Sequence, residues 1–342
     1  MATRKAPAGP SARRRLVERA RCGGITLVVG AGVSVPRGIP NWECLAKLVW
    51  AEAFGDSPSP WETPDTDRSP REVPQFLPII FELAYRKLGE AAFLETLRKN
   101  LYSKVRHPDD DKKFKRSNES LAVIARLILQ EYKRGPRRRI DAIITFNADD
   151  LLDRAVIALA AGPKRRGLDI IRSLARATHS DPAGSPRRPL PVYHIHGFVP
   201  SGYRAKYGYD HMLVFTDTQY WSTSASGAAF ANRVIASALS EGRCVFVGLS
   251  MTDVNLLRWL ALRTIEKDHD IAAIRNSQLP ASRERPINWG FQRHFWIRPR
   301  SDDPTGFISE FLSLRGVDSV EIAGWKGRGL RTLIEACFPP AG

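Results

Sequence analysis

Short apolar runs alternate with longer amphipathic stretches along the chain. The runs have the length and composition of strands that are buried on both faces of a parallel sheet. They span residues 25–29, 141–146, 192–195, 243–247, 294–297 and 317–321, with a shorter candidate at 212–215. Strands that alternate with helices in this way predict an α/β fold with a mainly parallel, Rossmann-like sheet.

Helical periodicity fills most of the segments between these runs. It is present at residues 41–54, 75–101, 117–133, 149–161, 217–240, 252–267, 304–315 and 328–337. Asn41 is the expected N-cap of the first of these helices, and Thr216 or Asp217 caps the helix that runs toward residue 240. We therefore expect a helical insertion, at about residues 55–135, between the first two core strands. Residues 162–190 hold Gly, Pro and basic residues and are predicted to form a long connection.

The two ends of the chain differ in character. Residues 1–21 are basic and rich in Ala and Pro, and we expect a disordered arm there. Residues 22–342 are expected to form a single domain that contains the helical insertion. No apolar run approaches the roughly 20 residues that span a bilayer, and the N-terminus lacks the apolar centre of a secretory signal. We therefore expect a cytoplasmic protein that makes no membrane contact.

The cysteines lie far apart in the sequence, as Cys22, Cys44, Cys244 and Cys337. None is paired as Cys-x-x-Cys, whereas a structural zinc site needs clustered ligands. The sequence therefore predicts no zinc module and no disulfide framework, and it predicts thiols that are buried or half-buried.

The formal net charge of the chain is +16 at pH 7. The basic clusters at residues 13–15, 137–139, 164–166 and 187–188 fall in predicted loops or in the N-terminal arm. Contact with nucleic acid through these basic loops is one explanation of the charge. An acidic partner protein and the attraction of a polyanionic ligand explain it equally well.

The first apolar run ends in a glycine turn, Gly30-Ala31-Gly32-Val33-Ser34. Gly30 and Gly32 can adopt backbone angles that are closed to other residues, and they allow the chain to approach a pyrophosphate without a Cβ in the way. The spacing departs from the full Gly-x-Gly-x-x-Gly fingerprint, so the turn alone is a weak signal. Polar residues after three further strands strengthen it, because parallel sheets bind ligands beyond the carboxyl ends of their strands.

Asn147 and Asp149 follow the second core strand. Helix capping explains one of the two residues, since Asn and Asp commonly open helices. An amide and a carboxylate two residues apart at a strand end would also face one ligand. They would then hold a ribose hydroxyl, a carboxamide or an attacking water.

His194 and His196 share one face of the next strand. Their spacing would suit half of a metal site, but no further metal ligands lie near them in the sequence. His196 is the last residue of the strand and is followed by Gly197. At that place it would act as a general base on a sugar hydroxyl or on water.

Gly248 and Ser250 follow the strand at residues 243–247, and a helix comes next. Ser250, Thr252 or Asp253 would cap that helix. The same loop would also hydrogen-bond a ribose or a phosphate, and the two interpretations are compatible.

Taken in their order along the chain, the motifs at these strand ends resemble the NAD-binding core of the sirtuin superfamily, over about residues 25–260. The resemblance implies a domain that binds NAD and cleaves its nicotinamide–ribose bond. Asn147 and Asp149 would line the nicotinamide and ribose pocket, and His196 would be the general base. The resemblance and the strand ends together give the expected NAD-binding residues, with no metal ligand among them: Gly30, Ala31, Gly32, Ser34, Ile39, Pro40, Trp42, Thr145, Gly248, Ser250, Asp253 and Asn255.

The chain departs from the protein-deacetylating sirtuins at three places. The four-cysteine zinc module is absent, Asn41-Trp42-Glu43 replaces the usual Asp-Phe-Arg, and Phe146-Asn147-Ala148-Asp149 replaces Gln-Asn-Ile-Asp. Residues 145–152 and 245–253 are more similar to divergent bacterial sirtuin-like domains. Those domains are typically NAD hydrolases of anti-phage defence systems.

This similarity favours an NAD hydrolase that uses NAD as a substrate, needs no metal and depletes NAD. The first alternative is an NAD-dependent protein deacylase or ADP-ribosyltransferase, against which the missing zinc module argues. The second is a non-catalytic module that binds nucleotide or nucleic acid, which leaves Asn147, Asp149 and His196 unexplained. By resemblance we also expect a homo-oligomer, or a complex with a HerA-like ATPase or a sensor protein.

Overall fold

The structure, a computed structural model, describes most of the chain. The described residues are 11–55, 57, 77–108, 111–160, 170–174, 189–202, 213–227, 229–241, 243–276, 293–325 and 327–340. Most of residues 55–74, at the start of the predicted insertion, and most of the connection expected at residues 162–190 lie outside them.

One open sheet of seven strands forms the centre of the fold, with the order β3-β4-β2-β1-β5-β6-β7. Every neighbouring pair is parallel. The strands are β1 (Ile25–Val29), β2 (Ile140–Thr145), β3 (Ile171–Leu174), β4 (Leu190–His194), β5 (Arg243–Val247), β6 (His294–Pro299) and β7 (Val317–Ile322). The predicted α/β fold with a parallel, Rossmann-like sheet is confirmed.

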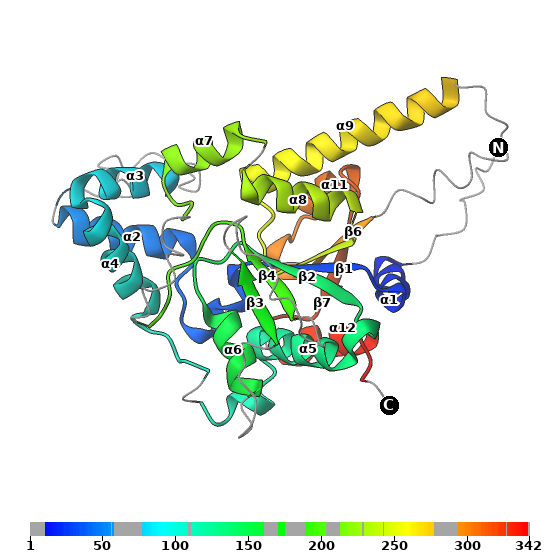
Figure 1. The fold of residues 1–342 in the computed structure, drawn as a ribbon, viewed down its shortest axis with the longest axis horizontal. Helices are drawn as coiled ribbons and strands as arrows, with labels where there is room; N and C mark the ends of the chain where they lie inside the picture. The colour runs from blue at the N-terminus through cyan, green and yellow to red at the C-terminus, as the bar shows by residue number, and fades with distance from the viewer. Residues whose placement is uncertain are drawn as a thin grey trace.

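Helices cover both faces of the sheet, as Figure 1 shows. Helices α5, α6 and α12 pack on one face, and α8, α9 and α11 pack on the other. The helices are α1 (Ala12–Cys22), α2 (Trp42–Phe54), α3 (Leu77–Leu88), α4 (Glu90–Tyr102), α5 (Ser120–Arg134), α6 (Leu151–Ala160), α7 (Asp217–Ala225), α8 (Phe230–Glu241), α9 (Val254–Asn276), α11 (Phe307–Leu314) and α12 (Gly329–Cys337). Because both faces are covered, β1 is buried along its whole length, which explains its unbroken apolar sequence.

The chain reverses its direction of travel across the sheet beside β1. On one side it continues from β1 to β2, then to β3 at the edge and back to β4 between them, whereas β5, β6 and β7 lie on the other side. This arrangement makes the carboxyl ends of β1 and β5 the switch point at which Rossmann-like sheets bind their ligands. The polar strand ends of the sequence therefore meet at the edge where a ligand is expected.

Helices α2, α3, α4 and α5 lie between β1 and β2 in the sequence, and α3, α4 and α5 fall within the helical insertion predicted at about residues 55–135. Asn41 caps α2 as expected, because its Oδ1 accepts a hydrogen bond from the backbone N of Cys44 at 2.8 Å. Helices α2, α3 and α4 form a group at the left of Figure 1. The side chain of Tyr102, at the end of α4, connects this group to the loops after β2 and β4.

The expectation of a disordered N-terminal arm is wrong for residues 12–21, which form most of α1. Ser11 caps the helix, and Leu16 and Ala20 are buried on its inner face. Arg15 forms an ion pair with Asp318 of β7 at 2.9 Å. The buried apolar face and this ion pair together hold the arginine-rich segment on the body of the protein. Residues 1–10 lie outside the described part.

Other local expectations also need correction. Strand β3 lies within the predicted connection, and its four residues are too few to produce a clear apolar run. Residues 213–215 form no strand, although Val214 N donates to the carbonyl oxygen of His196. Two helices, α7 and α8, replace the single helix expected at residues 217–240, and Asn232 Nδ2 donates to the carbonyl of Ser226 at the break between them.

The thiols fall into two classes. Cys244 and Cys337 are buried as predicted, whereas Cys22 and Cys44 are exposed, in contrast to the expectation. Cys22 ends α1 and Cys44 lies in the first turn of α2, so both are at helix ends on the surface. Among the helices of the described residues, none combines the length and apolarity that a bilayer crossing requires.

Candidate functional site

The glycine turn after β1 packs directly against the loop after β5. Gly30 N donates to the carbonyl oxygen of Val247, and Gly32 N donates to that of Gly248, each at 2.9 Å. A Cβ on Gly30 would lie 2.5 Å from the oxygen of Gly248, and one on Gly32 would lie 2.9 Å from it. Both glycines are therefore required for close contact between two backbones. Their predicted contact with a pyrophosphate stays a prediction.

Ser34 brings Asn147 and Asp149 together at the end of the sheet. Its side chain is fully buried, and its Oγ donates to Asp149 Oδ1 at 3.0 Å. Asn147 Nδ2 in turn donates to Ser34 Oγ at 3.2 Å. Thr145 Oγ1 accepts from the backbone N of Asn147, which fixes the start of the loop. Four residues that the sequence analysis selected are thus joined in one hydrogen-bonded group.

Asp149 has the helix-capping role that the sequence left open, and its contact with a ligand stays a prediction. Its Oδ1 accepts from the backbone N of Leu151, so it caps the start of α6. It also faces Ser34 inside the buried group. Burial raises the pKa of Asp149 to about 6, against the opposing effect of hydrogen bonds from Leu151 and Ser34. A carboxylate whose pKa is raised in this way is typical of functional sites.

His196 lies two residues beyond the last residue of β4, His194, so it is not the final residue of the strand as expected. Its ring is in edge contact with Phe146, at 5.1 Å between ring centroids, and with Tyr220, at 5.5 Å. Burial lowers the pKa of His196, while the charge of Asp253 opposes that shift. The imidazole is therefore neutral near pH 7 and able to accept a proton.

Asn147 and His196 each have a buried polar atom without a hydrogen-bond partner among the residues that the structure describes. The two atoms are Oδ1 of Asn147 and Nδ1 of His196. A buried polar atom without a partner is unfavourable in the folded protein alone. Such atoms fit a polar ligand that supplies the missing hydrogen bonds.

Three predicted site residues follow β5, and they differ in burial and in their contacts: Ser250, Asp253 and Asn255. Asp253 caps α9 by accepting from the backbone N of Leu256, and it also accepts from the hydroxyl of Tyr220 at 3.3 Å. Asn255 is buried and contacts Ser224, and its Nδ2 has no partner among the described residues. Ser250 is exposed. Helix capping is therefore established for Asp253, whereas contacts with a nucleotide stay predictions for all three residues.

Residues 35–40, which follow the glycine turn, are fixed by protein contacts. Gly38 has a φ of +102°, and a Cβ there would lie 2.2 Å from the carbonyl oxygen of Lys104. Ile39 is buried, Pro40 is partly buried, and Trp42 packs against Phe81 and Phe215. The structure therefore gives Ile39 and Trp42 packing roles, and their expected contact with NAD is untested.

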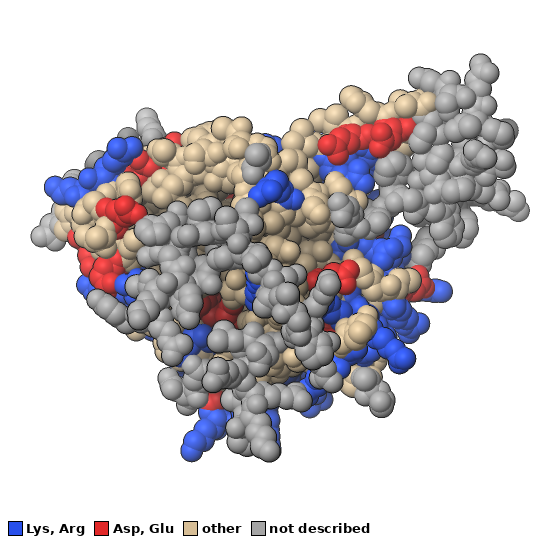
Figure 2. Space-filling view, in the orientation of Figure 1, with Lys and Arg blue, Asp and Glu red and all other residues tan. Residues whose placement is uncertain are grey.

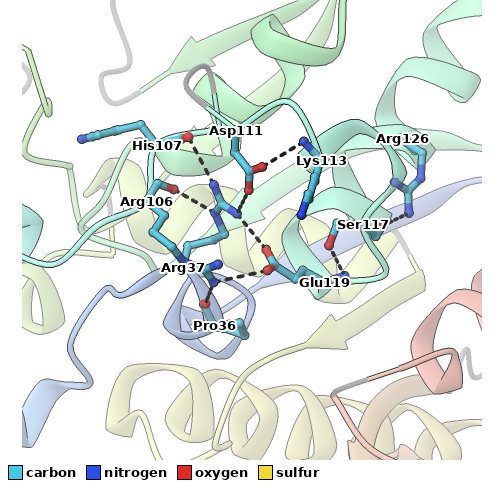
Figure 3. A network of polar contacts seen from close by, with 9 residues as sticks. All are labelled: Pro36, Arg37, Arg106, His107, Asp111, Lys113, Ser117, Glu119 and Arg126. Carbon is cyan, nitrogen blue, oxygen red and sulfur yellow. Dashed lines mark hydrogen bonds and ion pairs between the residues drawn. The ribbon is translucent and has the colours of Figure 1, made fainter.

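Arg37 is a buried residue that the sequence analysis did not select. Figure 3 shows its guanidinium between the carboxylates of Asp111 and Glu119, at 2.8 and 3.2 Å. It also donates to the carbonyl oxygens of Arg106 and His107. These contacts connect the loop after β1 to the segment before α5. In the sequence, Arg37 cannot be distinguished from a surface cation, because its partners lie about 70 to 80 residues further along the chain.

A second unexpected contact connects the helical insertion to the site. The hydroxyl of Tyr102 donates to the carbonyl oxygen of Val199 at 2.6 Å and accepts from the backbone N of Asp150 at 3.0 Å. Asp150 Oδ2 also accepts from the backbone N of Ser201. Burial raises the pKa of Asp150. The insertion therefore holds the segment that follows Asp149.

His194 is fully buried and does not extend toward the site as half of a metal pair. Its Nε2 lies 3.2 Å from Asp153 Oδ2, and Asp153 also contacts Ser173 of β3. Within the described ranges, no group of three or more His, Cys, Asp or Glu side chains is arranged to hold a metal ion. His194 therefore stabilises the contact between α6 and the edge of the sheet.

The fold and the site together define a Rossmann-like α/β protein with a buried polar site at its switch point. Residues 141–304 match the family model described as the SIR2-like domain. No curated protein matches the chain. The matched segment contains Asn147, Asp149, His196 and Gly248, whereas the glycine turn after β1 precedes it. SIR2-like domains bind NAD, so the match indicates an NAD-related activity.

The raised pKa of Asp149 predicts a gain in stability when the carboxylate is removed. The folded state binds the proton of the Asp149 carboxyl more tightly than the unfolded state does, so the stability falls as the pH rises from about 4 to about 6 and stays lower above that. We expect Asp149→Asn to increase the free energy of unfolding by about 3 kcal/mol at pH 8, with the difference vanishing toward pH 4. Urea unfolding at several pH values measures it.

Asp153→Asn is the matched control for this experiment. Burial raises the pKa of Asp153, but His194 and Ser173 lower it below its usual value in total. Removal of that carboxylate should therefore reduce the stability at pH 8. A loss of stability in Asp149→Asn at pH 8 would contradict the proposed effect of burial.

Proposed function

We propose that this protein hydrolyses NAD at the nicotinamide–ribosyl bond. The reaction consumes one water and yields nicotinamide, ADP-ribose and a proton. The observation that carries the proposal is the pair of buried atoms Asn147 Oδ1 and His196 Nδ1, which have no partner among the described residues. Asn147 is linked through Ser34 to the carboxylate of Asp149, and His196 packs on Phe146, the residue before Asn147. The match to the SIR2-like domain supports NAD as the ligand.

The chemistry of this bond suits the residues present. When nicotinamide leaves, positive charge develops on the ribose, and a buried carboxylate stabilises such charge strongly. Asp149 would supply that carboxylate above about pH 6. Asn147 would orient the attacking water or the ribose hydroxyls, and neutral His196 would accept the proton.

The remaining site residues are assigned by their positions around the switch point. We propose that residues 30–34 lie along the pyrophosphate, as loops that end parallel strands commonly do. Ser250, with Asp253 or Asn255, would bind the adenosine side. Ser34 keeps Asn147 and Asp149 in a fixed relation, so the two side chains are arranged before the ligand binds.

Analysis of the reaction products tests the proposal. Purified protein incubated with NAD should release nicotinamide and ADP-ribose in equal amounts, measured by liquid chromatography and mass spectrometry. In Asn147→Ala we expect the rate to fall about 100-fold or more, because the water or hydroxyl loses its orienting group. Asn118→Ala, at a partly buried position outside the site, is the control and should retain activity.

Other products would point to other activities. An ADP-ribosyl group on the protein, or NAD-dependent loss of an acyl group from peptides, would replace hydrolysis by transfer or deacylation. If NAD stays intact in the presence of the natural partner, or if Asn147→Ala behaves like the wild type, the proposal fails.

We further propose that the activity depletes NAD in anti-phage defence, in a homo-oligomer or together with a HerA-like ATPase or a sensor protein. The similarity of residues 145–152 and 245–253 to defence NAD hydrolases supports this role. The same product assay, applied to extracts of infected and uninfected cells, tests it. A defence role requires NAD to fall only after infection.

A further inference from the structure

The edge of the sheet opposite the candidate site carries a concentration of cationic side chains. We call it the basic edge. It comprises Arg13, Arg14, Arg19, Arg21, Lys133, Arg134, Arg137, Arg138, Arg139 and Arg243. Figure 2 shows Lys and Arg gathered around α1, at the right of the view. These residues lie at the amino ends of β1, β2 and β5, whereas the candidate site lies at the carboxyl ends.

Contacts between the segments make the basic edge one continuous surface. A Cβ on Gly23, which follows α1, would lie 3.6 Å from the Cα of Arg139. Arg139 Nη1 donates to the carbonyl oxygen of Cys337, and Arg243 Nη1 donates to that of Gly23. The backbone N of Ile25 donates to the carbonyl oxygen of Arg139. Basic residues from distant parts of the sequence are thus held in fixed positions.

Several of these cations face solvent. Arg13, Arg21, Lys133 and Arg137 are exposed, and the acidic side chain on α1 is Glu18, which pairs with Arg14. Most cations of the edge are arginines, whose planar guanidinium binds phosphate through two parallel hydrogen bonds. A surface of this kind suits a repeating phosphate backbone.

Among the described residues, the basic edge carries no exposed large apolar side chain, and this favours nucleic acid over an anionic membrane or an acidic protein as its partner. The exposed large hydrophobic side chains of the described residues lie mainly on α3, α7, α9 and α11, and none lies on the basic edge. Membrane-surface helices need an exposed apolar face, and stable protein interfaces need buried aromatic or aliphatic anchors. Nucleic-acid binding needs neither, because phosphate contacts supply most of its affinity.

We propose that the basic edge binds the phosphate backbone of nucleic acid. Because it lies at the opposite ends of the strands from the site, a bound nucleic acid leaves the carboxyl edge open. The protein can therefore hold a nucleic acid and its small ligand at the same time.

A charge-reversal variant tests this proposal. The variant combines Arg13→Glu, Arg21→Glu and Arg137→Glu, and the control combines Lys87→Glu, Lys112→Glu and Lys115→Glu, which changes the net charge equally. All six positions are exposed. Binding to labelled 30-nucleotide single-stranded and duplex DNA and RNA is measured by fluorescence anisotropy between 50 and 200 mM salt.

The expected result is a wild-type affinity that falls steeply with salt. The variant of the basic edge should bind at least tenfold more weakly, with a slope of log K against log salt that is smaller by about two to three. The control should stay within about threefold of the wild type. Equal losses in both variants, no binding by the wild type, or equally tight binding to anionic lipid vesicles would overturn the proposal. The readout is binding, so the result does not depend on NAD hydrolysis.

Discussion

Replacement of His196 by glutamine is expected to lower kcat for NAD hydrolysis by about 100- to 10,000-fold, the usual contribution of a general base. Glutamine is similar in size and forms hydrogen bonds, but it cannot accept a proton at neutral pH. Because its packing against Phe146 and Tyr220 is largely retained, the thermal unfolding midpoint should change little. Initial rates of nicotinamide release and a thermal unfolding curve measure the two effects.

The pH profile separates a catalytic role of His196 from a structural one. In the wild type we expect kcat/KM to fall as the pH drops through about 6, where Asp149 takes up a proton. Protonation of His196, whose pKa is lowered by burial, should steepen this fall. His196→Gln should lose the steeper component and retain the Asp149 component. His269→Ala, at an exposed position of α9, is the control. A His196→Gln enzyme with wild-type kcat would exclude His196 as the base.

Replacement of Arg37 by methionine is expected to reduce the free energy of unfolding by about 3–5 kcal/mol. The guanidinium is fully buried, forms ion pairs with Asp111 and Glu119, and lies over the ring of Phe114 at 4.9 Å from the centroid. Its loss leaves Asp111 without its ion-pair partner, Glu119 with only the mostly exposed Arg106, and the carbonyl oxygens of Arg106 and His107 without this donor. Urea unfolding at pH 7.5 measures the change.

A second readout connects Arg37 to the site. Arg37 immediately precedes Gly38, and its contacts hold the loop after β1, so the KM for NAD should rise in Arg37→Met together with the loss of stability. Arg106→Met is the control, because Arg106 is mostly exposed although it also pairs with Glu119. Its stability should change by no more than about 1 kcal/mol. If the free energy of unfolding fell by a similar amount in the two variants, the burial of Arg37 would not be the cause of its effect on stability.

The strands and the switch-point residues follow from the sequence because local patterns determine them. An apolar run of five residues before a glycine turn has few structural solutions other than a buried parallel strand. Ser34, Asn147 and Asp149 come together because the carboxyl ends of β1 and β2 lie side by side. Their convergence could therefore be predicted without the structure.

The features that the sequence did not predict depend on distant contacts. Helix α1 is ordered by the packing of Leu16 and Ala20 and by the pairing of Arg15 with Asp318, about 300 residues away in the chain. Arg37 and Tyr102 likewise have partners that only the fold brings near. The close contact of Gly30 and Gly32 with the loop at Gly248 was not predicted either, and their expected approach to a pyrophosphate stays a prediction. A local sequence pattern can indicate that a glycine is required without identifying the segment that lies against it.

The direction of the hydrogen bonds at Ser34 limits which chemical groups the site accepts. The single hydroxyl proton of Ser34 is given to Asp149, so its oxygen receives the amide hydrogen of Asn147. These two hydrogen bonds fix the orientation of the Asn147 amide, and its Oδ1 is then the atom without a partner among the described residues. A group that meets Asn147 there must therefore bring a hydrogen of its own, as water, a sugar hydroxyl or a carboxamide does. A phosphate oxygen would meet a lone pair at this position and be repelled.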